Sequence, residues 1–368
     1  MENWKTVRLG DVCEKGSSNI AQNEITDNNG EYPIYGAAGF IKNVDFYKQD
    51  KPYIGIVKDG AGVGRVSVHP AKSSLIGTMQ YIFPKENIDI KFLAEFLKYQ
   101  NLSRFYTGAT IPHIYFKDYQ NIPLKLPSLQ KQKHISAVLD KCTALITKHK
   151  LMLEKYDTLI KSRFIEMFGD NPVESGKWEV ETLADVCSSV VRGPFGSALK
   201  KDVFVPKSNN TVKVYEQKHA IQKSANIGTY YISQEKYEEL KRFECKPGDF
   251  IMSCSGTMGE FYQLPIGCEK GIINQALCKF SLNNKIEALF FLEWMKQSIH
   301  NLETKGSGIQ NVAAVSFIKQ MPVFLPPLTL QNDFASFVQQ IDKSKFAVQK
   351  SLEKTETLYK SLMQQYFG

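Results

Sequence analysis

The stretch "LEKYDTLIKSRFIEMFG" at 153–169 is repeated as "LEKTETLYKSLMQQYFG" at 352–368, 199 positions later in a chain of 368 residues. The similarity extends back without a gap to Leu126 and Leu325, and 13 of these 44 aligned positions are identical. In the first copy the identical positions are Leu126, Pro127, Leu129, Gln132, Leu153, Glu154, Lys155, Thr158, Leu159, Lys161, Ser162, Phe168 and Gly169. Self-similarity of this extent predicts a repeated architecture.

A second similarity marks the start of each repeat. "WKTVRLGDVC" from Trp4 and "WEVETLADVC" from Trp178 share five residues. The chain therefore reads as a tandem duplication, in which each half has a divergent body and a similar tail. We expect domains at 1–125 and 176–324, a central helix with linker at 126–175, and a C-terminal helix at 325–368.

Each tail is predicted to be one long helix, because neither contains Pro or Gly before its closing Phe-Gly. Apolar residues recur at steps of three and four, the pattern of a coiled-coil seam. In the first tail this seam comprises Ile135, Val138, Cys142, Leu145, Met152, Tyr156 and Leu159, with the polar His149 completing the series. In the second it comprises Phe334, Phe337, Ile341, Val348, Leu352, Leu358 and Leu362.

Two arrangements fit these helices. Each could pack on its own domain, or the two could pair as an antiparallel coiled coil about a pseudo-twofold axis. Pairing explains why the two copies have equal length without a gap, so we favour it. His149 is then expected to be a polar residue that sets the register of the seam.

The bodies are predicted to be α/β (α+β) modules of short strands and short helices. "KPYIGIVKDGAGVGRVSVHP" from Lys51 and "PGDFIMSCSGTMGEFYQLP" from Pro247 each read as strand, glycine-containing loop and strand. A further strand follows in each half, "IGTMQYIFP" or "IINQALCKF", and then a helix, "IKFLAEFLKYQN" or "IEALFFLEWMKQSIHNL".

Composition limits the classes of function. The formal net charge is +8, which favours a polyanionic partner. No apolar run is long enough to span a membrane and the first residues lack a signal-peptide core, so we expect a cytoplasmic protein with no membrane contact. The seven cysteines have no metal-binding or disulfide spacing, and we interpret them as small core residues.

The chain resembles the specificity subunits of type I restriction-modification systems over nearly its whole length. The resemblance rests on the glycine turns "YPIYGAAGFI", "GAGVGRV" and "SGTMGE", on "RGPFGSALK", on "GSGIQNVAAVSFIKQMPVFLPPL", and above all on the order of two bodies and two tails. It implies a non-catalytic reader of double-stranded DNA, with two target recognition domains held apart by paired helices. It also implies as partners two adenine-N6 methyltransferase subunits and two restriction/translocase subunits.

Residues near these loops are candidates for the DNA interface. Lys, Arg, hydroxyl groups and glycine-loop amides suit phosphate, whereas Asn and Gln suit adenine and Arg or Lys suit guanine. The candidates are Tyr35, Gly36, Lys58, Gly60, Arg65, Gln80, Thr110, His113, Lys117, Arg192, Lys200, Lys201, Ser253, Ser255, Thr257, Gln275, Gln310 and Asn311. "GATIPHIYF" lacks the Asn that follows the glycine loop in many relatives and that the second half has as Asn311, which raises the question whether His113 takes over a DNA contact.

Other chemistries have little support. "GAGVG" precedes a predicted strand where a dinucleotide site needs a helix, and the chain has no P-loop, no Asn-Pro-Pro-Tyr or related methyltransferase motif, and no histidine pair at metal spacing. We therefore expect no catalytic residue, no metal site and no cofactor. The alternative to a DNA specificity subunit is a duplicated, non-catalytic interaction scaffold.

Overall fold

The computed structural model describes residues 4–108, 112–304 and 315–368. By their internal contacts these form two compact units. Unit 1 consists of residues 1–152 together with 348–368, and unit 2 consists of residues 153–347. Each unit therefore contains one body and parts of both tails.

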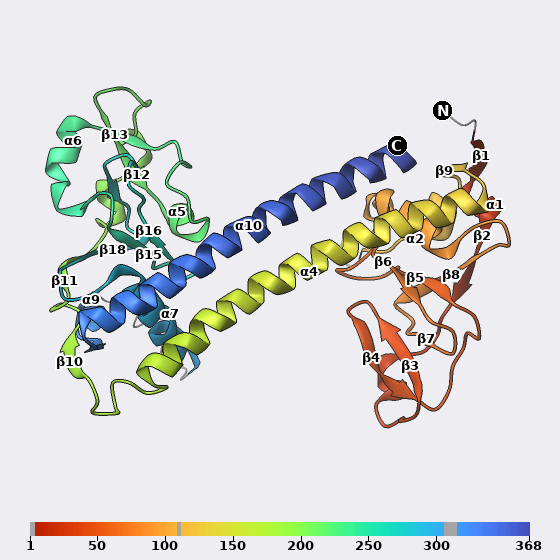
Figure 1. Cartoon of the computed structure of the whole chain (residues 1–368). Helices are drawn as coiled ribbons and strands as arrows, with labels where there is room; N and C mark the ends of the chain where they lie inside the picture. The colour runs from red at the N-terminus through yellow and green to blue at the C-terminus, as the bar shows by residue number, and fades with distance from the viewer. Residues whose placement is uncertain (1–3, 109–111, 305–314) are drawn as a thin grey trace. The chain divides into compact units, whose positions relative to one another are not determined.

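The two tails are the helices α4 (Leu129–Phe168) and α10 (Leu328–Phe367), each 40 residues long (Figure 1). Their equal length and their offset confirm the expectation of two matched helices. Each helix passes through both units, so that each unit contains a segment of α4 and a segment of α10.

The body of unit 1 is built mainly on antiparallel strands, and β3 and β7 form its one parallel pair among the described strands. A four-stranded sheet has the order β2-β8-β5-β6, a three-stranded sheet the order β4-β3-β7, and β1 pairs with β9. The strands are β1 (Lys5–Arg8), β2 (Cys13–Ser17), β3 (Tyr32–Gly36), β4 (Gly39–Val44), β5 (Tyr53–Val57), β6 (Val66–His69), β7 (Ser74–Leu75), β8 (Met79–Pro84) and β9 (Pro123–Leu126). The helices of this body are α1 (Leu9–Val12), α2 (Ile90–Tyr99) and α3 (Phe116–Tyr119).

The body of unit 2 has a related plan. Its sheets have the orders β11-β18-β15-β16 and β13-β12-β17-β14, and β10 pairs with β19. The strands are β10 (Glu179–Thr182), β11 (Cys187–Arg192), β12 (Thr211–Tyr215), β13 (Tyr231–Ser233), β14 (Glu244–Cys245), β15 (Phe250–Ser253), β16 (Phe261–Gln263), β17 (Gly271–Ile273), β18 (Leu277–Leu282) and β19 (Pro322–Leu325). The helices are α5 (Gln217–Ile221), α6 (Gln234–Glu239), α7 (Ala288–Thr304) and α9 (Val315–Lys319).

These elements confirm the predicted mixed α/β bodies, with one difference. "IINQALCKF" was expected to form a single strand, but it forms β17 and β18 separated by a turn. The Asn274 side chain accepts a hydrogen bond from the Ala276 N–H at 3.1 Å, and such local bonds favour a turn over a continuous strand. The two strands consequently belong to different sheets.

Within each unit the two helix segments run antiparallel. In unit 1, Glu356 of α10 lies 3.2 Å from Lys150, and Met363 packs in the same core as Leu139 and Ile135. In unit 2, Lys345 lies 2.5 Å from Asp157, and Phe334 packs on Phe164 with ring centroids 5.3 Å apart. In both units, positions further along α10 meet earlier positions of α4. Supercoiling of the pair into a coiled coil stays a prediction.

The inward face of the helices differs from the predicted seam at three leucines. Leu145, Leu159 and Leu358 are 47%, 45% and 52% exposed. Their next neighbours Ile146, Ile160 and Tyr359 are less exposed and take the inward positions. The predicted register was wrong there because apolar residues occur in adjacent pairs, and steps of four and three fit the sequence as well as steps of three and four.

A buried glutamine joins each long helix to its body. Gln132 accepts a hydrogen bond from the Asp89 N–H at 2.8 Å and donates to the carbonyls of Asn87 and Pro127. Gln331, its counterpart in the repeat, accepts from the Glu287 N–H at 2.8 Å and donates to two carbonyls in the same way. The identity of these two glutamines in the sequence thus has a structural cause.

Candidate nucleic-acid interface

Three loops of unit 1 come together at the ends of its strands. Arg65, in the loop between β5 and β6, donates a hydrogen bond to the Ala37 carbonyl of the β3–β4 hairpin at 2.8 Å. The Gly60 N–H donates to the Pro112 carbonyl at 3.0 Å, and the Ile114 N–H donates to the Lys58 carbonyl at 3.0 Å. The glycine loop therefore holds the hairpin on one side and residues 112–114 on the other.

His113 lies at the junction of these loops. Its Nδ1 is hydrogen-bonded to the carboxylate of Asp59, and its ring lies 4.1 Å from that of Tyr115. The Lys117 ammonium group lies 5.2 Å from the centre of the Tyr115 ring, a cation–π contact. Two loops separated by 54 positions thus share one polar cluster.

Tyr35 and Gly36 occupy the hairpin beside this cluster. The Tyr35 ring lies 4.3 Å from the ring of His69, which is hydrogen-bonded to the Ser67 hydroxyl at 2.7 Å. Burial lowers the pKa of His69 to about 4, so this imidazole is neutral at pH 7. His69 is therefore part of the support under the hairpin rather than a charged contact group.

The structure thus groups seven unit 1 candidates: Tyr35, Gly36, Lys58, Gly60, Arg65, His113 and Lys117. Gln80 does not join them, because its side chain is buried and donates to the Tyr119 hydroxyl at 2.5 Å. We correct this candidate: β8 lies inside its sheet, and Gln80 is committed to the core. Thr110 lies outside the described residues.

A corresponding group of loops lies in unit 2. Arg192, at the end of β11, donates from Nε to the Gln275 carbonyl at 3.3 Å. Gly193 lies so close to this loop that an added Cβ would lie 1.9 Å from the Asn274 carbonyl oxygen. Gln275 itself is exposed, as are Lys200 and Lys201 on the segment that follows. Lys201 lines the same hollow as Asn274 and Gln275, so these four candidates share one surface region.

A residue that the sequence analysis missed, Gln217 of α5, organises the neighbouring glycine loop. Its amide donates to the carbonyls of Ser255 and Thr257, the latter at 3.2 Å. Thr257 is exposed and Ser255 half-buried. The loop also touches the Gln275 region, since the Cys254 N–H donates to the Ala276 carbonyl at 2.8 Å.

The remaining unit 2 candidates have other positions. Ser253 is fully buried and its hydroxyl accepts from the Glu260 N–H at 3.0 Å, so we correct it to a structural residue of the β15–β16 turn. Gln310 and Asn311 lie outside the described residues. No motif would have identified Asp59 or Gln217 in advance, because each acts through a loop remote in sequence.

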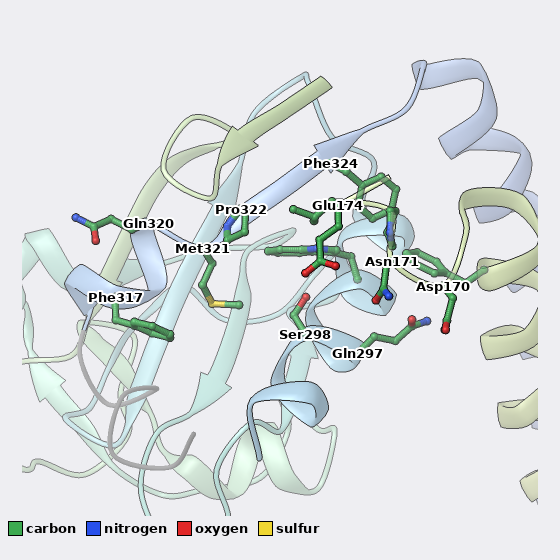
Figure 2. Close-up of a pocket in the computed structure, with 14 residues that line it drawn as sticks. Asp170, Asn171, Glu174, Gln297, Ser298, Phe317, Gln320, Met321, Pro322 and Phe324 are labelled. Atoms are coloured by element: carbon green, nitrogen blue, oxygen red, sulfur yellow. The ribbon is translucent and has the colours of Figure 1, made fainter. Parts of the chain in front are cut away.

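A cavity of about 430 Å³ in unit 2 lies away from these loops (Figure 2). Asp170, Asn171 and Glu174 from the segment after α4 line it, together with Gln297 and Ser298 of α7. Among the described residues, its charged side chains are acidic, which disfavours phosphate. Of the candidates that the structure describes, none lines this cavity.

The described residues contain no group of three or more potential metal ligands. The seven cysteines are free thiols, and six are buried, as expected for core residues. Among the described helices, none combines the length and the apolar character needed to cross a bilayer.

Comparison with known proteins gives relatives along the whole chain. The family described as "Type I restriction modification DNA specificity domain" matches residues 1–155 and 175–356. The Type I restriction enzyme EcoDI specificity subunit of Escherichia coli is 21% identical, over 99% of this chain and 88% of that protein. The putative type I restriction enzyme specificity subunit S.HindORF215P of Haemophilus influenzae is 26% identical, over 62% of this chain and 60% of that protein.

Solved structures share the fold. The S subunit of a type I restriction-modification system from M. genitalium matches with a TM-score of 0.61 at 15% identity, over 100% of this chain and 96% of that chain. A chain from a study of complex assembly and conformational transition of the type I R-M system matches with a TM-score of 0.57 at 14% identity, over 100% of this chain and 98% of that chain. Because the family match covers most of both halves, this chain belongs to the DNA specificity subunits of type I restriction-modification systems.

Proposed function

We propose that this subunit reads a bipartite, asymmetric site on double-stranded DNA, with one half-site read by each unit. The observation that supports this most directly is the recurrence of one kind of loop group. In each unit a glycine loop, an arginine bonded to a backbone carbonyl, and exposed lysines or polar side chains lie together. Family membership supplies the DNA partner.

The chemistry of these groups suits DNA. Half or more of the hydrogen bonds between proteins and DNA go to phosphate or sugar, and lysine, arginine and loop amides make them well. Gln275 and Thr257 in unit 2, and His113 in unit 1, can reach base edges from between such positioning contacts. Because the two groups differ in their polar side chains, the two half-sites should differ in sequence.

Salt dependence tests this assignment. We expect alanine at Lys58, Arg65, Lys200 or Lys201, tested one at a time, to weaken binding similarly for all sequences. Each change should lower the steepness of the plot of log affinity against log salt by about one unit. Lys360→Ala, on α10 outside both loop groups, is the control and should leave the slope unchanged. Four unchanged slopes would contradict the proposed interface.

We also propose that the two long helices bind the partner subunits, two adenine-N6 methyltransferases and two restriction/translocase subunits. Leu159 and Leu358 are counterparts in the repeat, and each is about half exposed in its own unit. Matched apolar residues would give two copies of one partner equivalent contacts. Leu159→Glu or Leu358→Glu should then reduce co-purification of a methyltransferase, whereas Lys161→Glu on the same helix should not.

The subunit is proposed to be non-catalytic. The purified chain should transfer no methyl group and cut no DNA, and methylation should occur only after its methyltransferase is added. Methyl transfer by the isolated chain would contradict this. The alternative, an interaction scaffold, would be favoured if the assembled complex bound DNA without sequence preference and without the expected response to the four cation variants.

A further inference from the structure

Phe195 of unit 2 is an exposed aromatic side chain with no role in the core. It is 91% exposed, although it lies in a segment rich in apolar residues. Pro194 just before it is buried, and Ala198, Leu199 and Phe204 after it pack against a buried cluster. The segment therefore packs its other apolar residues, including a second phenylalanine, and leaves Phe195 in solvent.

The backbone around Phe195 is fixed on both sides. The Gly193 N–H donates to the Leu277 carbonyl at 2.9 Å, and the Ala198 N–H donates to the Phe195 carbonyl at 2.9 Å, closing a short 3₁₀ turn. Further along, Phe204 stacks on Tyr230 with ring centroids 4.3 Å apart and an interplanar angle of 6°. Phe195 is thus presented by an anchored loop.

The surroundings of Phe195 point to a nucleic-acid partner. Between residues 192 and 204 the sequence has three cations, Arg192, Lys200 and Lys201, and one acidic residue, Asp202. Neither Lys200 nor Lys201 enters an ion pair among the described parts of the chain. Arg192, three positions before Phe195, donates to the carbonyl of the exposed Gln275, a candidate base reader.

We infer that Phe195 acts as a wedge that partly unstacks a base-pair step in or beside the half-site read by unit 2. An apolar side chain inserted between two base pairs kinks the duplex, and the bent DNA then contacts a larger area of the protein. Pyrimidine–purine steps unstack most easily, so such a step is the expected target. This inference rests on the proposed function and adds a specificity determinant that makes no hydrogen bond.

The test uses the subunit assembled with its methyltransferase. The DNA is an unmethylated duplex that carries the recognition site, as identified by methylation mapping, with 2-aminopurine placed at successive positions. Because unstacking relieves quenching, binding should raise the 2-aminopurine fluorescence several-fold at one step other than the target adenines, which the methyltransferase itself takes out of the stack. Phe195→Ala should abolish that rise and weaken specific binding on the order of ten-fold, while the salt slope stays unchanged. Phe195→Trp should keep both the fluorescence rise and the affinity.

Ile266→Ala is the matched control, since Ile266 is 98% exposed in the same unit but lies outside the segment of cations. It should leave fluorescence and affinity unchanged. The inference is overturned if Phe195→Ala keeps the rise and the affinity, or if it loses the methyltransferase instead of DNA. If the wild-type complex shows no sequence-specific binding at all, the proposed function itself fails, and the two failures remain distinguishable.

Discussion

Cutting the chain after Gly169 should produce a homodimer. In unit 1 the end of α10 packs on the body through Tyr359, Met363 and Phe367. The fragment lacks α10, but α4 offers the counterparts Ile160, Phe164 and Phe168. About 25 residues of continuous helix, roughly 38 Å, separate Ile160 from the turns of α4 that pack on the body of the same fragment. These three counterparts therefore cannot fold back onto that body, and only a second copy of the fragment can supply them.

The stability of this homodimer depends on which contacts of α10 are kept when α4 of a second copy takes its place. Asp157 replaces Glu356 opposite Lys150, and Phe168 replaces Phe367 against Phe92. Tyr359 is lost, and with it the bond from its hydroxyl to the buried Glu95 carboxylate at 2.6 Å. A hydrogen bond to a charged group contributes about 1.5–3 kcal/mol.

Ile160→Tyr in the fragment should restore that bond. A twofold dimer has two such contacts, so the gain should be about 3–6 kcal/mol, or roughly 10²- to 10⁴-fold in the dimer dissociation constant. Ile160→Phe is the control, since it adds the ring without the hydroxyl. Sedimentation equilibrium measures both. A folded, monomeric fragment at micromolar concentration, or equal dissociation constants for the Tyr and Phe variants, would refute the reasoning.

Three further predictions concern stability and the reader loops. Burial lowers the pKa of His69, so the stability that its neutral form contributes is present above pH 6.5 and is lost as pH falls toward 4. Between pH 7.5 and 5, the free energy of unfolding measured with urea should fall by about 2 kcal/mol. His69→Phe should not show this fall. Gln132→Ala and Gln331→Ala should each lower the free energy of unfolding by about 2–4 kcal/mol, because each leaves buried backbone groups without a hydrogen-bond partner. The two losses should add, since the glutamines belong to separate units. A loss under about 0.5 kcal/mol in both variants would contradict the role given to them. Gln275→Ala should change which base is tolerated at one position, as mapped by methylation, without changing the salt slope.

The sequence predicted the order of bodies and long helices because the duplication gives each feature in two copies. The equal tails, the strand–loop–strand segments and the helices after them all follow from the spacing of apolar residues and from the positions of Gly and Pro. It could not choose the inward face of α4 and α10, since Leu145 and Ile146, or Leu159 and Ile160, are equally apolar. Only the packing of both helices selects one of each pair.

The candidate site was predictable to a similar degree. Glycine loops and nearby cations were identifiable by residue type, and most of them lie together in their unit. Gln80 and Ser253 were misplaced because each lies in a strand that is buried on both faces, β8 or β15, and a polar residue type suggested an exposed position there. The Asp59–His113 pair and the Gln217 contacts join loops 38 to 54 positions apart, and local patterns carry no signal for such contacts.

The division of each helix between two units affects how the protein is made. The body of unit 1 leaves the ribosome early, but residues 348–368, which complete its core, are translated only after all of unit 2. At 5–20 residues per second, the intervening residues 153–347 take roughly 10–40 s. During that interval the apolar surface that later binds Phe367, which includes Phe92 and Phe96, lacks its partner. A nascent chain on a neighbouring ribosome, or a chaperone, could bind this surface first. The yield of correctly folded subunit should therefore depend on the rate of translation.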